Sequence, residues 1–144
     1  PAAALLKPVA PETSPGCRAR LGDKACRVDL ALHRRVLSIS GVASEVASVS
    51  GGGLAPGAYV FGQIRWLEGP NCGLNQSIVA NDATSVTLSE PPAFAVTAGT
   101  RALLTEGCDK QMATCSARFA NAVNFRGEPY LPGMDLLTRY PGAK

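Results

Sequence analysis

Residues 33–106 carry the feature that most constrains the fold: short runs of alternating apolar and small polar residues, interrupted by turn signals about every ten residues. The runs VLSISGV and AYVFGQIRWLEG follow the two-residue period of a strand, and the SGGGLAPG stretch before the second run is typical of a turn. This pattern predicts a mainly β fold, a small antiparallel β-barrel or sandwich of about five to seven short strands.

Three further segments complete the predicted elements. Residues 75–90 predict a hairpin, with strands SIVA and SVTLSE on either side of an Asn-Asp turn. After a pair of prolines, residues 94–107 predict a second strand pair that turns at an Ala-Gly step. In the C-terminal flank, a spacing of three and four residues predicts one short helix that presents Met112, Cys115, Phe119 and Val123.

Length and composition fit one globular domain. The chain has 144 residues, of which 46% are apolar and 17% are charged, so the composition is not that of a disordered protein. A net charge of +3 gives no basis for nucleic-acid binding. No apolar run approaches the length of about 18 residues that a membrane span needs.

The first 16 residues contain four prolines and predict an extended arm. The opening PAAALLKPVAP has no basic start and is broken by Pro8 and Pro11, so it does not resemble a signal peptide. A first residue of Pro suggests removal of Met, processing, or a fragment of a longer protein.

Four of the five cysteines lie in the flanks of the β-rich segment, as the pairs Cys17-x8-Cys26 and Cys108-x6-Cys115. If an antiparallel barrel brings its flanks together, four thiolates converge, which is a ligand set for structural zinc or an iron–sulfur cluster. The gaps are long for a zinc knuckle and unlike the short cysteine spacings of bacterial ferredoxins. Buried thiols, or two disulfides with one spare cysteine, remain alternatives at this point.

The flanks also resemble a known family. The segment GCRARLGDKACRVDL, followed after the β-rich middle by GCDKQMATCSARFANAVNFRGEPYLPGMD, is similar to the C-terminal part of phage tail hub or tail-tip proteins. These belong to siphophage-like particles and gene transfer agents, and the minor tail protein L of lambdoid phages has a related role. The resemblance implies a [4Fe–4S] cluster, with zinc as the alternative metal, and it implies four cysteine ligands: Cys17, Cys26, Cys108 and Cys115.

The resemblance implies a structural role. The chain would be a virion protein of the tail tip or hub, assembled in the bacterial cytoplasm, with other tail-tip proteins as partners and a homotrimer in the assembled tail. The implied division is an arm at residues 1–16, an iron–sulfur domain at residues 17–135 that a cluster clamps at its two ends, and a tail at residues 136–144. Proteins of the family usually carry a further N-terminal domain, which these 144 residues do not include.

Two other functions are compatible with the same residues. One is an electron-transfer or redox-sensing module that uses the four cysteines, and the other is a secreted β-domain with two disulfides and a free Cys72. An enzyme is not expected, because the sequence has no phosphate-binding loop, HExxH or GxSxG motif and its one histidine, His33, is expected at a surface or strand edge.

Several neighbours of the cysteines have expected roles. Asn121 and Asn124 are expected to bond the irregular backbone, as Asn side chains do in turns. Phe119 and Phe125 are expected to pack as ordinary core residues and could also shield the sulfurs. Gly127 is expected to shape a turn, by a positive φ if one is needed.

Overall fold

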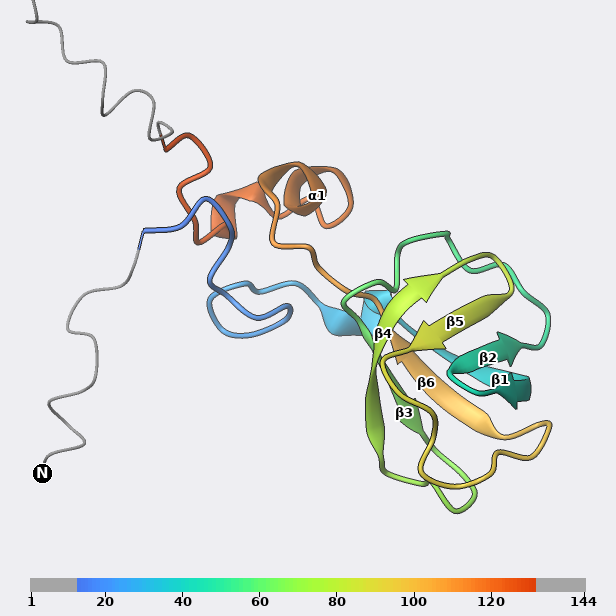
Figure 1. The fold of residues 1–144 in the computed structure, drawn as a ribbon. Coiled ribbons are helices and arrows are strands. Elements are labelled where there is room, and N and C mark those ends of the chain that lie inside the picture. Colours follow the sequence, from blue (N-terminus) through green and yellow to red (C-terminus); the bar gives the residue numbers. More distant parts are fainter. Residues whose placement is uncertain (1–12, 132–144) are drawn as a thin grey trace, which may run out of the picture.

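The structure is a computed structural model of the chain and describes residues 13–131. Six strands form a closed antiparallel barrel in the spatial order β1-β2-β5-β4-β3-β6 (Figure 1). The mainly β prediction is therefore confirmed, as a barrel and not a sandwich. Predictions for residues 1–12 and 132–144 lie outside the described residues. The strands are β1 (Arg34–Ala43), β2 (Val46–Val49), β3 (Gln63–Trp66), β4 (Asn75–Asn81), β5 (Ser85–Leu88) and β6 (Arg101–Thr105).

The barrel encloses a core made of every second residue of its strands. Ile64, Leu104 and Val86 are fully buried, whereas their neighbours along the strands face outward. Trp66 is also buried, and its indole Nε1 donates to Gln76 Oε1 at 2.9 Å. Burial of the apolar groups supplies the main stabilisation, at about 25 cal/mol for each Å² removed from water.

The predicted hairpin of residues 75–90 is present as β4 and β5, but the predicted strand pair of residues 94–107 is wrong. Only β6 is a strand there, and the residues before it form a loop. Buried Asn71 fixes this loop: its Nδ2 donates to Phe94 O at 2.7 Å, and Phe94 N donates to its Oδ1 at 2.9 Å. Side-chain bonds replace the ladder that a strand would have made.

The helices are short and lie in the flanks: η2 (Leu30–His33), α1 (Met112–Ala117) and η3 (Ala122–Asn124). The predicted helix exists, but it ends before Val123, which is 91% exposed. A positive φ of 47° at Ala120 interrupts the helical backbone between α1 and η3. No helix among the described residues is long and apolar enough to cross a membrane.

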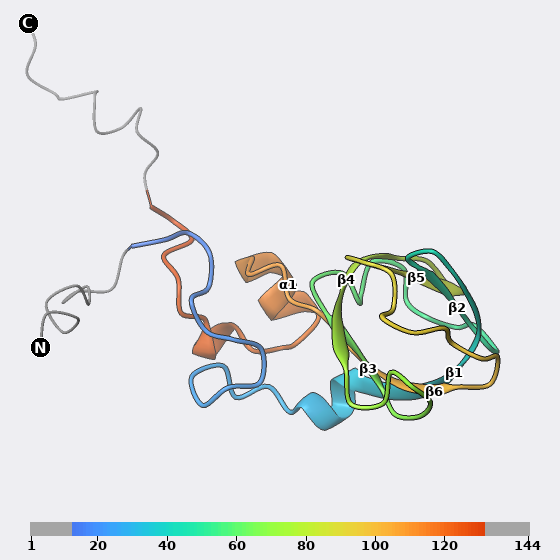
Figure 2. The same ribbon diagram turned by 60° about the horizontal axis from the view of Figure 1, so that its bottom comes forward.

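The pairing of the first and last strands positions the candidate site. β1 and β6 are antiparallel neighbours, with Arg34 opposite Thr105, so the start of β1 and the end of β6 lie at the same end of the barrel. The segment before β1 and the segment after β6 therefore leave the barrel side by side (Figures 1 and 2).

The exit from β6 passes another backbone segment very closely. A Cβ at Gly107 would overlap Val60 O and the backbone of Phe61 and Gly62, and a Cβ at Gly62 would overlap Thr105 O. Only glycine lets the two backbones approach this closely. This crossing is where the chain turns from the barrel toward the cysteines.

We expect Gly107→Ala to lower the free energy of unfolding by about 2 kcal/mol or more, because the new Cβ meets backbone that cannot move aside. The matched control is Gly41→Ala on β1, where a Cβ meets nothing within 4 Å. That variant should change stability by no more than about 0.5 kcal/mol, or raise it. Urea unfolding followed by circular dichroism measures both, and equal effects would contradict the role of the crossing.

Candidate metal centre

The structure brings together the four cysteines of the flanks. Cys17, Cys26, Cys108 and Cys115 line one small enclosed space between the segment before β1 and the segment after β6. The rest of its lining is mostly apolar, and Phe119 and Phe125 contribute aromatic rings. The sequence named these four residues as a set, and the fold places them around the same space.

All five cysteines are free thiols in the structure, so it pairs none of them as disulfides. Cys26 and Cys115 are buried, and Cys17 and Cys108 are partly exposed. Burial raises the pKa of the Cys115 thiol, and the nearby Cys108, Cys17 and Cys26 raise it further. Thiols that repel one another when ionised are suited to a positively charged partner that all four share.

Backbone hydrogen bonds join the two flanks around this space. Cys17 N donates to Lys110 O at 2.9 Å, and Arg18 N donates to Arg126 O at 3.0 Å. The Lys110 ammonium also donates to Ala19 O. These bonds connect residues about 100 positions apart in the sequence, so they hold the N-terminal flank onto the C-terminal one without a regular sheet.

Two N–H groups point at cysteine sulfurs. Arg126 N donates to Cys17 Sγ at 3.3 Å, and Asn121 Nδ2 lies 3.6 Å from Cys26 Sγ. Asn121 is buried and also donates to Cys26 O at 2.6 Å, while Asn124 Nδ2 donates to Asn121 Oδ1 at 2.6 Å. The expected bond to irregular backbone is therefore present for Asn121, whereas Asn124 supports the Asn121 side chain. N–H groups directed at sulfur are typical of protein iron–sulfur sites, where they tune the cluster.

The turn that carries Cys26 is fixed by the carboxylate of Asp23. Asp23 Oδ1 accepts from Ala25 N at 2.9 Å and Cys26 N at 2.7 Å, and Oδ2 accepts from Arg20 N at 2.9 Å. These bonds lower the pKa of Asp23, with the Cys26 N–H the largest cause. The turn that Asp23 caps therefore presents Cys26 to the shared space.

Glu128 closes the outer edge of the site. Its carboxylate accepts two hydrogen bonds from the Arg18 guanidinium, at 2.7 and 2.9 Å, and one from Ser14 N at 2.9 Å. These contacts, with Arg18 the largest cause, lower the pKa of Glu128 to about 2. Beside it, Gly127 is required for a reason other than the expected positive φ, because a Cβ there would collide with the backbone of Gly16.

A second set of contacts joins the cysteine-bearing flank to the barrel. His33 Nδ1 lies 2.9 Å from Glu106 Oε2, and Arg118 Nε lies 3.8 Å from the same oxygen. The Arg118 guanidinium also donates to Gly107 O and stacks 4.7 Å from the Phe119 ring centre. His33, expected at a surface or edge, is instead partly buried in this joint, edge-on to Phe119.

Four thiols are a donor set that either a zinc ion or an iron–sulfur cluster accepts. Within residues 13–131, no group of three or more His, Cys, Asp or Glu side chains is already arranged to hold a metal ion. The four thiols nevertheless face one space from separate segments, and two of them receive N–H groups. Soft thiolates that meet a group from different directions suit an iron–sulfur cluster, which is wider than a zinc ion.

The sequence excluded Cys72 from the set. It lies in the loop between β3 and β4, at the opposite end of β3 from Gln63 and the cysteine site, and its Sγ contacts Leu67 O at 3.1 Å. The sequence did not predict the ion pair of Arg18 with Glu128 or the contacts of Glu106 with His33 and Arg118. Charged residues of the two flanks were visible in the sequence, but nothing in it showed which of them pair.

Fold and site together define a class of protein: a small closed β-barrel whose two flanks converge to gather four cysteines. The chain belongs to the family described as phage conserved hypothetical protein BR0599, whose profile matches residues 57–135, more than half of its length. The match includes Cys108 and Cys115.

A solved structure is also similar. The chain matches a protein from the structure described as the virion of a native gene transfer agent (GTA) particle, with 30% sequence identity and a TM-score of 0.82. The match covers 99% of this chain and 52% of that protein, so the chain spans about half the length of its relative. Comparison with curated proteins returned no match.

The ion pair between Arg18 and Glu128, called the Arg18–Glu128 clamp below, predicts a specific dependence of stability on pH. Because folding lowers the pKa of Glu128 from 4.5 to about 2, its contribution to stability is complete above pH 4.5 and is lost as the pH falls toward 2. We expect Glu128→Gln to destabilise the protein at neutral pH and to destabilise it less, relative to the wild type, near the acid end. Urea midpoints measured across this range give the difference.

The control is Glu90→Gln, which neutralises an exposed carboxylate outside the site. It should unfold at the same urea concentrations as the wild type across the range. If the difference between Glu128→Gln and the wild type were the same at neutral and acid pH, the clamp would not be the source of the effect.

Proposed function

We propose that the chain is a non-catalytic structural component of a phage or phage-like virion, in which a [4Fe–4S] cluster holds its two flanks together. Membership of a phage protein family and similarity to a protein of a gene transfer agent virion support the virion part. The proposed ligands are the four cysteines of the flanks, and zinc is the alternative metal.

One observation carries the cluster part of the proposal. Cysteines from positions 17 and 26 and from positions 108 and 115 line the same space, although the whole barrel separates them in sequence. Thiols that only filled a core would not need to come from both flanks. The location suits a cross-link that fastens segments with little secondary structure of their own.

When bound, the cluster supplies four iron–sulfur bonds, and these tie the folded flanks together as a structural metal does. Other residues of the site direct hydrogen bonds at the sulfurs, limit the access of water and balance charge. Arg126 N and Asn121 Nδ2 are directed at sulfurs, and Phe119 is buried and limits access of water. Lys110, which lines the space, carries a positive charge that offsets thiolate charge.

We propose the tail tip or hub as the location in the particle, with other virion proteins as partners and a homotrimer as the assembled form. This position follows from the resemblance of the two flanks to tail hub proteins. A trimer interface or a partner contact is not needed for the cysteine site, because this chain supplies all four cysteines.

The test is to produce the protein under anaerobic conditions and to count iron and acid-labile sulfide for each chain. Four of each, with the brown colour of a [4Fe–4S] centre, are expected. If the protein contains zinc and no sulfide, zinc is the bound metal and the cluster assignment is wrong. A colourless, metal-free protein with four unreactive cysteines would favour disulfides. A cluster that mild reductants reduce and air reoxidises would favour electron transfer. The position of Cys108, which also borders an open cleft, is compatible with that alternative.

We expect Cys115→Ser to reduce the iron content and to lower the free energy of unfolding by about 3 kcal/mol or more, because it removes a ligand from the link between the flanks. Cys72→Ser is the matched control and should keep both values, because Cys72 is exposed and lies outside the site. Iron analysis and urea unfolding measure both variants. Loss of iron in Cys72→Ser and not in Cys115→Ser would refute the ligand assignment.

A further inference from the structure

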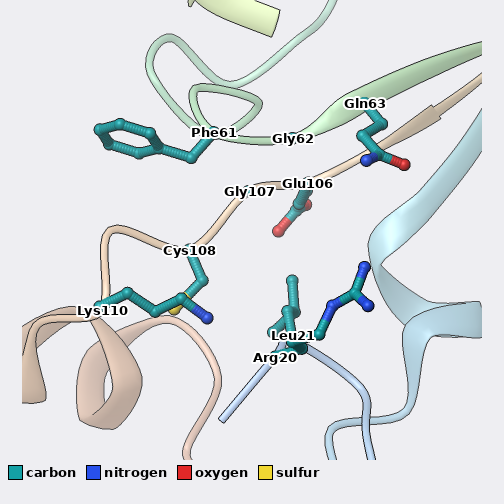
Figure 3. Close-up of a pocket in the computed structure, with 9 residues that line it drawn as sticks. All are labelled: Arg20, Leu21, Phe61, Gly62, Gln63, Glu106, Gly107, Cys108 and Lys110. Atoms are coloured by element: carbon teal, nitrogen blue, oxygen red, sulfur yellow. The ribbon is translucent and has the colours of Figure 1, made fainter. Parts of the chain in front are cut away.

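A cleft opens between the barrel and the N-terminal flank, next to the cysteine site. Figure 3 shows Arg20 and Leu21 on one side of it and Phe61 on the other, with the Glu106 carboxylate between them. Gln63 of β3 and Lys110 also line the cleft. The cleft is open to solvent, and no residue of the described chain fills it.

Phe61 is an aromatic side chain held in an exposed position. Its side chain is 69% exposed, and its backbone has a φ of 64°, which is rare for a bulky residue. The close crossing of Gly62 and Gly107 fixes the adjacent backbone, and Phe61 N donates to Ile78 O at 3.0 Å. The backbone that carries the ring is therefore held in place at the rim of the cleft, and exposed aromatic groups are common anchors of protein interfaces.

Charge in the cleft is unbalanced toward positive. Glu106 is the carboxylate that lines it, and this group already faces His33 and Arg118. The Arg20 guanidinium has no ion-pair or hydrogen-bond partner among residues 13–131. Lys110 donates to Ala19 O and also lies near the Asp23 carboxylate, whose pKa it helps to lower. An incoming carboxylate would find in Arg20 a cation that has no carboxylate partner in the described chain.

The cleft continues onto the outer wall of the barrel through Gln63. Pairing of β1, β6 and β3 places Arg34, Thr105 and Gln63 in one row, and Val36, Leu103 and Arg65 in the next. Side chains directly opposite one another share a face, and this face points away from the core. Val36 is 54% exposed, and neither Arg34 nor Arg65 has a carboxylate partner in the part of the chain that the structure describes.

We propose that this basic face binds an extended segment of another protein in which carboxylates alternate with apolar side chains. The face is defined by Arg20, Arg34, Arg65 and Lys110, with Phe61 and Val36 as its apolar contacts. Charge complementarity identifies the partner, because this face presents unpaired cations and its carboxylate is already engaged.

Spacing supports an extended partner. Arg34 and Val36 point to the same side of β1 and lie about 7 Å apart, the distance between alternate side chains of an extended peptide. A nucleic acid is a poorer match, because exposed apolar groups lie among the cations and phosphate contacts need closely set Lys and Arg. The face shares Lys110 with the cysteine site, but none of its residues is a proposed ligand, and the variants that test the face leave Lys110 unchanged.

The test uses the full chain and fluorescein-labelled peptides of about nine residues, with binding followed by fluorescence anisotropy. The main probe has Asp, Leu, Asp, Phe and Asp at alternate positions and Ser elsewhere. One control probe replaces Asp with Lys, a second replaces Leu and Phe with Ser, and a labelled oligonucleotide represents nucleic acid. We expect the main probe to bind with a Kd of about 10–100 μM and the control probes to bind at least about tenfold more weakly.

Two variants locate the binding. Arg20→Gln with Arg65→Gln should raise the Kd at least about tenfold, and Phe61→Ala should raise it about fivefold or more. Ser48→Glu with Ser50→Glu is matched in net charge but lies on and after β2, which pairs with Ile39–Ala43 of β1 and not with the part of β1 that carries Arg34 and Val36, and it should change the Kd less than about twofold. The altered side chains are exposed, and circular dichroism checks that each variant is folded.

Several results would overturn the inference. They are no binding of the main probe at about 1 mM, equal binding of the Lys probe, tighter binding of the oligonucleotide, or an equal effect of the control variant and the variants of the basic face. None of these results would change the iron and sulfide count, so failure of this inference is distinguishable from failure of the proposed function.

Discussion

Antiparallel pairing between the first and last strands is the constraint on which the rest of the structure depends. Because β1 and β6 are neighbours, the segment that precedes the barrel and the segment that follows it start from the same end. They can then exchange backbone hydrogen bonds, as Cys17 does with Lys110, at little cost in loop closure. Without this pairing the four cysteines would have no common location.

The barrel and the cysteine region are stabilised in different ways. The barrel has a continuous apolar core and no free strand edge. The flanks have one short α-helix and depend on specific polar contacts, including the Arg18–Glu128 clamp and the contacts of Glu106. A small region of this kind has few apolar groups to bury, which is the usual setting for a metal or other cross-link.

The two sides of the Gly62–Gly107 crossing serve different surfaces. Toward the interior, the crossing directs the chain to Cys108 and the enclosed space that the thiols share. Toward solvent, it leaves Phe61 exposed across the cleft from Arg20. One tight backbone contact thus organises both the candidate metal centre and the basic face.

The sequence by itself determined the mainly β class and the hairpin of β4 and β5, because periodicity and turn residues act locally. The resemblance of its flanks also named the four cysteines as a set. The sequence did not determine that residues 94–99 form a loop, since a bond from distant Asn71 decides that. Only the tertiary structure decided that the cysteines share one space, which cations lack a partner and why Gly107 must be glycine. Each of these depends on contacts between residues far apart in the chain, and a linear pattern does not encode which distant groups meet.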